Sequence, residues 1–248
     1  TREAKARTSW LAPREGFEKP VEAFVRGLVV EPRGAGLRDE IRAFAGRLVR
    51  PGLWNALSRV VVHLAGPGTP DVYQGDDLWN FSLVDPDNRR PVDYGLRARL
   101  LAELDRAAGK PGRLLADLLA RPEDGRIKLW VTTRLLRERR HRPAPFVGGG
   151  YEPVEATGAH ARSVFAFLRR GADGSAALAV VPRLPLSVTP DGAPPVGAAW
   201  RDTRLALPAP LARRGWRSVL GAPELEGGAQ VAVADALRNL PVGVFVAT

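Results

Sequence analysis

The segment 67–93 holds the densest mixture of polar and aromatic side chains in this chain. Its six carboxylates lie close to the amide of Asn88, two guanidinium groups and three aromatic rings: Asp71, Asp76, Asp77, Asp85, Asp87 and Asp93; Arg89 and Arg90; Tyr73, Trp79 and Phe81. Carboxylates, amides and guanidinium groups hydrogen-bond hydroxyls in pairs, and aromatic faces cover pyranose rings, so this mixture suits carbohydrate recognition. The alternative is a scaffold loop, in which Asp-Pro-Asp-Asn forms a turn and the arginines pair with neighbouring carboxylates.

Other kinds of chemical site find no support in the residues. Cys is absent, which excludes disulfides and thiolate ligands, and His63, His141 and His160 lack the spacing of metal ligands. No Ser-His-Asp arrangement, phosphate-cradling glycine loop or zinc motif is present. We therefore predict no metal and no cofactor, and we expect His63 to be a satisfied core residue on an apolar helix.

The elements that must position this segment are mostly helical. Apolar spacing predicts helices over 20–30, 37–50, 53–64, 96–104, 114–119 and 127–136. Pro20 suits a first helical turn, and Pro51-Gly52 is expected to break the chain between two helices. Residues 71–75 are predicted to form a short strand, and 76–93 a long connection whose following helix Asp93 caps.

After Pro143 the pattern changes to short β-prone runs separated by turn residues. Strands are expected at 151–156, 163–168, 176–181, 200–207, 216–220, 231–233 and 242–246. Seven short strands at this spacing favour a small antiparallel β-sandwich. The sequence therefore predicts two regions, 1–145 and 146–248, with the boundary near Gly148-Gly149-Gly150.

Composition narrows the choice of partners. The chain has 248 residues and a net charge of +10, which is compatible with a nucleic-acid binder. Arg, Ala, Gly and Pro are abundant throughout, and the basic run 134–142 has the pattern of a solvated helix face without interleaved aromatics. We therefore predict no nucleic-acid partner, which strong salt-sensitive retention on heparin would contradict. No apolar run reaches the roughly 18–20 residues that span a bilayer, so no membrane partner is expected.

The start of the chain favours a piece of a longer cytoplasmic protein. Residues 1–5 are polar and carry both charge signs, unlike a signal peptide, and the chain contains no Met. The absence of Cys fits the cytoplasm. We expect a fragment, and we expect its N-terminal helices to expose apolar faces when they lack the strands that they cover.

Several runs resemble one enzyme family in the expected order along the chain. Residues 65–75 (AGPGTPDVYQG) resemble the eighth-strand region of the α-amylase family, and 82–93 (SLVDPDNRRPVD) resemble the maltooligosyltrehalose synthases within it. Further matches are Lys5 with Thr8-Ser9-Trp10, Gly125–Leu129, Tyr151–Val154 and Val180–Leu184. The first run alone indicates only the broad family, whereas the set indicates the synthases.

The resemblance implies both a fold and an activity. Residues 1–145 would supply the C-terminal helices and last strand of a (β/α)8 barrel, in an α/β plus all-β chain, and 146–248 would form the β-sandwich. The activity would be that of a (1→4)-α-D-glucan 1-α-D-glucosylmutase, an intramolecular transglucosylase that converts the reducing-end α-1,4 linkage of maltooligosaccharides into an α,α-1,1 linkage in trehalose biosynthesis. A maltooligosyltrehalose trehalohydrolase would be its functional partner.

Catalytic residues are not expected in this chain. The family's Asp nucleophile, Glu acid/base and supporting Asp lie on earlier strands, and the His-Asp-Thr-Lys-Arg segment that carries the supporting Asp is absent here. We therefore assign no catalytic residue and expect the chain alone to be inactive. The resemblance instead implies substrate contacts, for which the candidates are Tyr73, Gln74, Asp85, Asp87, Asn88, Arg89 and Arg90.

The resemblance also implies a role for individual candidate residues. Arg89 and Arg90 would orient the loop and contact hydroxyls, while Asp87 and Asn88 would bind the sugar at the reducing-end side. Where the family usually shows Gly-Thr-Glu, this chain has Gly75-Asp76-Asp77, so the reach of the shorter Asp77 is in doubt.

Two other functions remain open at this point. One is a fragment of an α-amylase-family glucan hydrolase, and the other is a noncatalytic α-glucan-binding module in which Trp200 and Trp216 stack on sugar. Trp10 could also stack on glucan, but burial between helices is the preferred interpretation.

Overall fold

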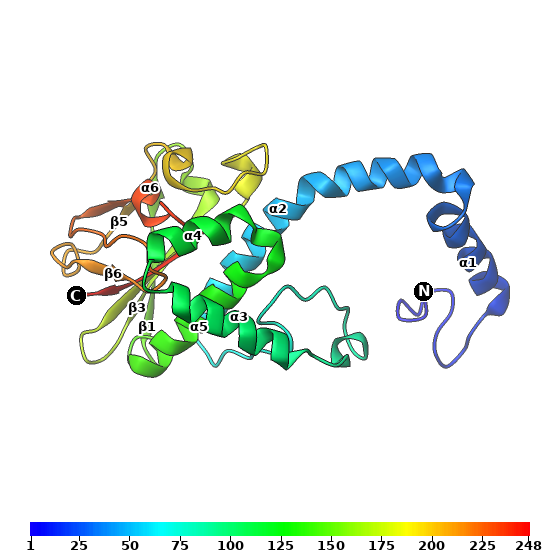
Figure 1. The fold of residues 1–248 in the computed structure, drawn as a ribbon, viewed down its shortest axis with the longest axis horizontal. Helices are drawn as coiled ribbons and strands as arrows, with labels where there is room; N and C mark the ends of the chain where they lie inside the picture. Colours follow the sequence, from blue (N-terminus) through cyan, green and yellow to red (C-terminus); the bar gives the residue numbers. More distant parts are fainter. The chain divides into compact units, whose positions relative to one another are not determined.

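The structure, a computed structural model, describes all 248 residues and divides into two compact units, residues 1–49 and 50–248 (Figure 1). The α-helices are α1 (Glu15–Val29), α2 (Ala35–Ala65), α3 (Tyr94–Ala107), α4 (Pro111–Ala120), α5 (Arg126–His141) and α6 (Val233–Ala236). Short 3-10 helices are η1 (Pro32–Gly34), η2 (Asp87–Arg89), η3 (Pro122–Asp124), η4 (Ala161–Ser163), η5 (Pro185–Ser187) and η6 (Gly197–Trp200). No helix is both long enough and apolar enough to span a membrane.

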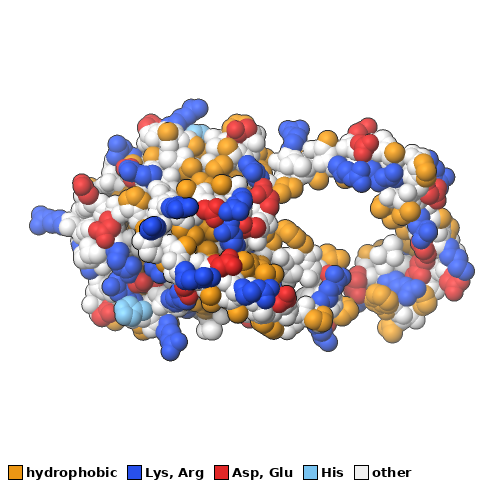
Figure 2. All heavy atoms as spheres, viewed as in Figure 1, with side chains coloured by type: hydrophobic (Ala, Val, Ile, Leu, Met, Phe, Trp, Pro, Cys, Tyr) orange, Lys and Arg blue, Asp and Glu red, His pale blue; other side chains and the backbone are white.

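The first unit consists of an N-terminal loop, α1, η1 and the beginning of α2. The helix predicted from residue 20 begins five residues earlier, so Pro20 lies inside α1 and not in its first turn. Glu15 and Glu18 occupy that first turn, where carboxylates are favoured by the positive end of the helix dipole. The apolar stripe of this unit is exposed, as predicted, and includes Phe24, Val29, Ile41 and Phe44 (Figure 2).

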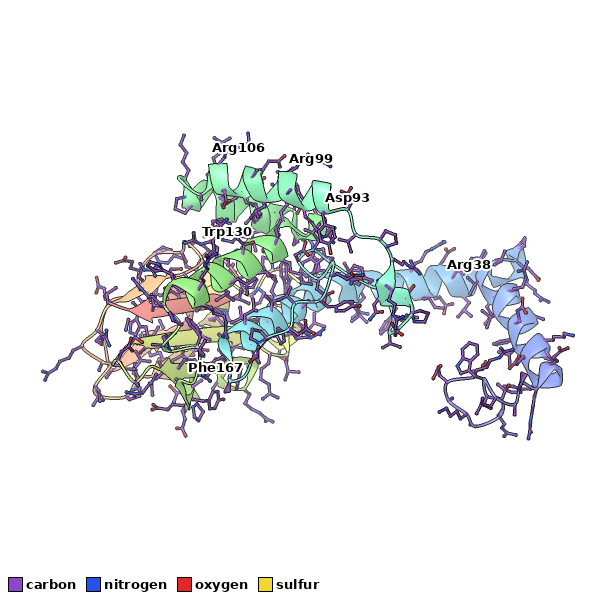
Figure 3. All side chains as sticks on the ribbon, turned by 90° about the horizontal axis from the view of Figure 1, so that it is seen from below. Arg38, Asp93, Arg99, Arg106, Trp130 and Phe167 are labelled. Carbon is purple, nitrogen blue, oxygen red and sulfur yellow. The ribbon has the colours of Figure 1, made fainter.

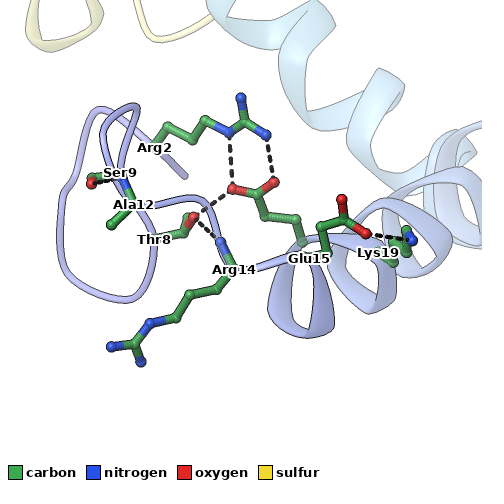
Figure 4. Close-up of polar contacts among 8 residues, drawn as sticks. Arg2, Thr8, Ser9, Ala12, Arg14, Glu15 and Lys19 are labelled. Carbon is green, nitrogen blue, oxygen red and sulfur yellow. Dashed lines mark hydrogen bonds and ion pairs between the residues drawn. The ribbon is translucent and has the colours of Figure 1, made fainter.

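The Thr8-Ser9-Trp10 motif closes the N-terminal end of α1. Thr8 is buried; its Oγ1 donates to Glu18 Oε1 over 2.5 Å and accepts from the Arg14 backbone N–H over 3.0 Å (Figure 4). Arg2 donates two hydrogen bonds to the same carboxylate, at 2.9 and 2.6 Å. Trp10 is 62% exposed, so the expected burial between helices is wrong; its ring lies under the Arg2 guanidinium, 5.1 Å away.

Acid is expected to release this N-terminal loop. The hydrogen bonds from Arg2 and Thr8 hold the pKa of the Glu18 carboxyl at about 2, below its ordinary value of 4.5. A carboxyl with a depressed pKa stabilises the folded form above pH 4.5, and this stabilisation is lost as the pH falls towards 2. The protection factor of the Arg14 amide, which compares its exchange rate with the intrinsic rate at the same pH, should therefore fall over this range, and a 13C NMR titration should give Glu18 a midpoint of about 2.

Substitution provides the control for this titration. Glu18→Gln should lower the protection factor of the Arg14 amide even at pH 6 and make that factor independent of pH, whereas Glu15→Gln removes only the exposed pair with Lys19 and should change neither. A Glu18 midpoint near 4.5 in the unmodified chain would contradict the hydrogen-bond arrangement.

Helix α2 runs without interruption where two helices were predicted. Pro51 lies inside it, although an internal proline removes a hydrogen bond and crowds the preceding turn at a cost of about 3 kcal/mol. The turns that follow carry Trp54 and Leu57, both completely buried, and Trp54 donates its indole N–H to the Gly192 carbonyl over 3.2 Å. Tertiary packing outweighs the local helix-breaking signal, and the predicted break at Pro51-Gly52 is wrong.

Residues 71–75 form no strand, so the predicted last strand of a barrel is also wrong for this chain. Tyr73 and Gly75 instead belong to a turn closed by a bond from the Asp76 N–H to the Tyr73 carbonyl, 3.0 Å. A β-prone run becomes a strand only when another strand completes its hydrogen bonds, and every strand of the structure lies beyond residue 149.

The remaining strands form two antiparallel sheets. They are β1 (Gly150–Val154), β2 (Ala156–Thr157), β3 (Val164–Arg170), β4 (Ala176–Pro182), β5 (Arg204–Ala206), β6 (Trp216–Ser218), β7 (Gln230–Ala232) and β8 (Gly243–Ala247). The five-stranded sheet has the order β1-β3-β4-β8-β6, and the three-stranded sheet the order β2-β5-β7. The antiparallel arrangement is confirmed, and six of the seven predicted runs each overlap one strand. The run 151–156 is instead divided between β1 and β2, which lie in different sheets, while Trp200 lies in η6 and Val233 begins α6.

The five-stranded sheet contributes to two cores. One face packs against the three-stranded sheet, with Leu168 and Phe245 meeting Leu205 and Val231. The other face packs against the helices, where Phe167 and Val244 share a core with α2, α4 and α5 (Figure 1). Alternation of side chains across a strand places these residues on opposite faces. The boundary between 145 and 146 therefore stays a prediction, and one apolar core joins both sides of it.

Candidate functional site

The candidate site is the contact loop, residues 73–93, which leads from α2 to α3. Its backbone turns at Gly75, whose φ of +88° is one that a side-chain-bearing residue rarely adopts. Asp87 holds the far end, because its Oδ2 accepts the Leu83 N–H over 2.7 Å at the start of η2. The Gln74 amide reaches the Asn88 carbonyl at 3.5 Å, so two predicted contact residues lie side by side although fourteen positions separate them.

The arginines of the loop pair with its carboxylates. Arg89 donates to both oxygens of Asp85, one of these bonds being 2.6 Å, and Arg90 donates to Asp87. This is the pairing that the scaffold interpretation predicts. Exposed ion pairs contribute only about 0–1 kcal/mol to stability. They therefore orient these side chains and can still be exchanged for hydrogen bonds to a ligand. The same carboxylates and guanidinium groups keep unused lone pairs and N–H groups for hydroxyls.

The contact loop presents a mixed surface to solvent. Tyr73 is 42% exposed and its hydroxyl makes no hydrogen bond, while Gln74, Asp85, Arg89 and Arg90 are also exposed. Three apolar side chains of the loop are more exposed than Tyr73, namely Phe81, Leu83 and Val84. Exposed apolar side chains among polar ones mark a surface suited to a partner or ligand. The other two candidates, Asp87 and Asn88, are half-buried, and the glucan-contact assignment stays a prediction.

A buried ion pair anchors the base of the loop on α3. Arg97 Nε lies 2.5 Å from Asp77 Oδ2, and the same guanidinium donates through Nη2 to the Gly75 carbonyl over 2.9 Å. Both side chains are less than a quarter exposed. Asp77, the residue that departs from the family pattern, is therefore occupied by Arg97. Asp93 caps α3 as predicted, since its Oδ1 accepts the Leu96 N–H over 2.7 Å.

Helix α5 supplies a second anchor. Lys128 Nζ donates to the Leu78 carbonyl over 2.9 Å and lies 5.7 Å from the centre of the Trp79 ring. Trp79 in turn donates its indole N–H to the Pro122 carbonyl over 2.7 Å. Burial lowers the pKa of the Lys128 ammonium, and the carboxylates of Asp76 and Asp77 oppose that shift. The loop base is thus held by cations that approach from two helices.

These anchors were missed by sequence reasoning. Lys128 lies in the Gly125–Leu129 run that resembles the family, but the run alone gave it no role. Arg97 carried no signal, because its partners Asp77 and Gly75 come together with it only in the fold. Trp79 was noted as an aromatic of the loop and serves instead as a half-buried anchor.

The histidine and tryptophan interpretations need correction. His63 is exposed, and its Nε2 lies 2.8 Å from the Asp71 carbonyl, so it is not a core residue. Trp200 and Trp216 each expose no more than 1% of their surface, so neither can stack on a sugar. The glucan-binding-module alternative loses the residues on which it depended. No group of three or more His, Asp or Glu side chains is placed to hold a metal ion.

The chemistry available to this site is binding. The exposed carboxylate of Asp85 and the half-buried carboxylate of Asp87 are each paired with a guanidinium group. A glycosyl transfer that retains configuration needs one carboxyl as nucleophile and a second as acid and base on either side of the bond. The contact loop offers hydroxyl-binding groups and apolar surface, and we assign none of its residues to catalysis.

Comparisons with known proteins agree on one enzyme group. No protein-family model matches the chain. Proteins assigned as maltooligosyl trehalose synthases in two strains of Mycobacterium tuberculosis, CDC 1551 and H37Rv, are 40% identical over 172 residues, or 69% of this chain and 19% of each relative. This chain thus spans about a fifth of the length of the curated relatives that it matches.

Solved structures extend the match to the whole chain. A mutant of the maltooligosyltrehalose synthase of Arthrobacter ramosus is 36% identical with a TM-score of 0.75, covering 100% of this chain and 29% of that protein. A second maltooligosyl trehalose synthase, 23% identical with a TM-score of 0.67 over 28% of its length, supports the fold alone. The resemblance that the motifs indicated is therefore confirmed: over its whole length, this chain is similar to a portion of a maltooligosyltrehalose synthase.

Proposed function

We propose that this chain is the C-terminal part of a (1→4)-α-D-glucan 1-α-D-glucosylmutase, in which the contact loop forms one wall of the glucan site. The observation that carries the proposal is the 36% identity to a synthase of known structure over all of this chain. The exposed Tyr73, Gln74 and Arg90 supply the kind of surface that such a wall needs.

The loop would bind sugar through exchange of its own ion pairs. A glucose hydroxyl that enters between Arg90 and Asp87 can accept from the guanidinium and donate to the carboxylate, so both charged groups stay satisfied. Asp85 and Arg89 offer a second pair of the same kind four residues apart. Tyr73 provides an aromatic face for the apolar side of a pyranose ring.

The reaction would use carboxyls from polypeptide that this chain does not contain. One carboxylate attacks the anomeric carbon and the α-1,4 bond breaks, while a carboxylic acid protonates the departing oxygen. The freed glucose then turns, and the same group, now a base, takes the proton from its anomeric hydroxyl as that oxygen attacks the anomeric carbon of the glycosyl-enzyme, whose bond to the carboxylate breaks and releases that carboxylate. The contact loop would hold this glucose and help to exclude water, which would otherwise give hydrolysis.

The architecture proposed for the longer protein is a (β/α)8 barrel followed by the two-sheet region. The helices α1 and α2 would cover barrel strands supplied by other polypeptide, which accounts for their apolar stripe at Phe24, Ile41 and Phe44. A maltooligosyltrehalose trehalohydrolase, acting on the α,α-1,1-linked product, belongs to the same proposal as a functional partner.

Product analysis on maltopentaose tests the proposal. The longer enzyme that includes this sequence should yield a non-reducing product of unchanged chain length, because the transfer is intramolecular. A steady rise in reducing sugar would instead identify the α-amylase-family hydrolase alternative.

The 248-residue chain alone should give no non-reducing product from maltopentaose. It lacks the His-Asp-Thr-Lys-Arg segment, and the carboxyls of its contact loop are held in exposed ion pairs. Chromatography of the incubated sugars with the purified chain checks this expectation. Measurable product would mean that catalytic carboxyls exist within residues 1–248.

A further inference from the structure

A hollow of about 480 Å³ lies on the C-terminal half of α5, outside the contact loop. Its lining is Arg134, Arg137, Glu138, Arg140 and His141. Arg134, Arg137, Glu138 and His141 are three, four and seven positions apart and face the same side of the helix. Arg140, six positions after Arg134, lies at the edge of this side and also lines the hollow. Figure 2 shows lysine and arginine side chains interspersed with acidic and apolar ones over the helices.

Neighbouring groups neutralise part of this lining. Glu138 is 7% exposed, and its two carboxylate oxygens accept hydrogen bonds from Arg217 Nη2 at 2.9 and 3.0 Å. Arg142 Nη1 lies 3.6 Å from Glu138 Oε1 and forms a second ion pair. Arg137 donates to both oxygens of Asp105, at 2.5 and 2.8 Å. Arg134 and Arg140 have no carboxylate within ion-pair distance. The guanidinium groups of Arg134 and Arg140 therefore have no ion-pair partner, although the nearby carboxylates of Glu138 and Asp105 partly offset the charge of Arg134.

Arg134 is already held in one orientation. Its Nε donates to the Val219 carbonyl over 2.9 Å, and its guanidinium lies 5.3 Å from the centre of the Trp130 ring (Figure 3). These contacts leave its two terminal amino groups available. Burial lowers the pKa of Arg134, and the positive charge of Arg137 adds to that shift. A fixed, partly desolvated guanidinium loses little conformational entropy when it binds an anion.

The helix dipole accounts for only part of this cluster. Basic residues in the last turn of α5, Arg139, Arg140 and His141, offset the negative end of the helix. That effect is confined to the last turn, whereas Arg134 lies about two turns earlier. A charge at Arg134 without a carboxylate partner is therefore left unexplained by helix stability.

We propose that this hollow binds the phosphate group of a small molecule, with Arg134 and Arg140 as its guanidinium ligands. A planar guanidinium fork matches two phosphate oxygens at once, and two such forks balance a phosphate dianion. The volume is at the lower end of the range for small-molecule sites and leaves room for a group attached to the phosphate. A single hollow on one helix suits a small ligand better than a nucleic-acid strand, which would need an extended basic track.

Calorimetry on the 248-residue chain tests this site with inorganic phosphate and with glucose 6-phosphate as probes. Either probe should bind saturably at one site per chain. Arg140→Gln should weaken binding roughly tenfold, and adding Arg134→Gln should weaken it by a similar factor again, because each removes a charge-assisted contact. Tighter binding of glucose 6-phosphate would identify a phosphorylated small molecule as the source, and equal binding would identify free phosphate.

The controls separate a built site from general positive charge. Arg140 is exposed and contacts no acidic partner, so Arg140→Gln should fold normally, as melting curves can verify. Arg99→Gln removes an exposed arginine from α3 and should leave the affinity within twofold. No saturable binding, or an equal loss in Arg99→Gln, would overturn the proposal. Tighter, steeply salt-dependent binding of a single-stranded oligonucleotide would overturn it in favour of a nucleic-acid surface.

Discussion

Trp130→Ala is expected to lower the free energy of unfolding of residues 50–248 by about 4 kcal/mol, the range found for large aromatic residues removed from a core. Trp130 is 3% exposed and lies on α5, facing the five-stranded sheet (Figure 3). Its indole N–H donates to the Leu220 carbonyl over 3.0 Å, so the substitution also leaves that buried acceptor without a partner. Urea unfolding followed by circular dichroism measures the loss.

Trp130→Phe is the matched control for this substitution. It keeps most of the buried ring and loses chiefly the hydrogen bond to Leu220, so it should cost about 1–2 kcal/mol. Because α5 and the sheet share one core, the helical and sheet signals should unfold in a single transition in both variants. Two separate transitions, with only the helical one affected, would show that residues 146–248 fold independently of the helices.

Arg97→Ala is expected to lower kcat/KM on maltopentaose roughly a hundredfold in the longer enzyme, because small displacements of substrate-positioning groups have effects of this size. The change removes the partner of Asp77 and the bond to the Gly75 carbonyl, and both contacts fix the base of the contact loop. The loop would then sample several arrangements and hold the sugar in the productive one less often. Both kcat and KM should change, since Arg97 acts through the loop as a positioning residue.

Two further measurements isolate this positioning effect. Arg99→Ala, an exposed neighbour on α3, should leave kcat/KM within twofold (Figure 3). In the 248-residue chain, Arg97→Ala should accelerate amide hydrogen exchange across residues 75–92 and leave the β-strands unchanged. An Arg97→Ala enzyme with normal kinetics would show that the anchor on α3 does not matter for the reaction.

Local patterns were enough to predict most elements of the fold. Apolar spacing located α3, α4 and α5, and short β-prone runs located the strands of the two sheets except β2, which was not separated from β1. The failures came where distant contacts override local preference. Pro51 stays inside α2 because Trp54 and Leu57 pack in the core, and 71–75 form no strand because no neighbouring strand pairs with them.

In the candidate site, too, contacts between neighbours in the sequence could be predicted and contacts between distant residues could not. Sequence and family resemblance predicted an exposed, polar contact loop and the cap at Asp93, since both depend on neighbours in the chain. They did not predict that Arg97 and Lys128 hold the loop from α3 and α5, because these contacts span 20 and 50 positions. The sequence left open whether Arg89 pairs with a loop carboxylate or stays free, and only the structure shows that it pairs with Asp85.

Hydrogen exchange of the longer enzyme with and without a saturating, non-reducing maltooligosyltrehalose tests the central claim most directly. Bound sugar should slow exchange within residues 73–92, where Tyr73, Asp85 and Arg90 are exposed in the free chain, and should leave 200–216 unchanged. Slowed exchange confined to residues 146–248, with the contact loop unaffected, would contradict the assignment of this loop to the glucan site.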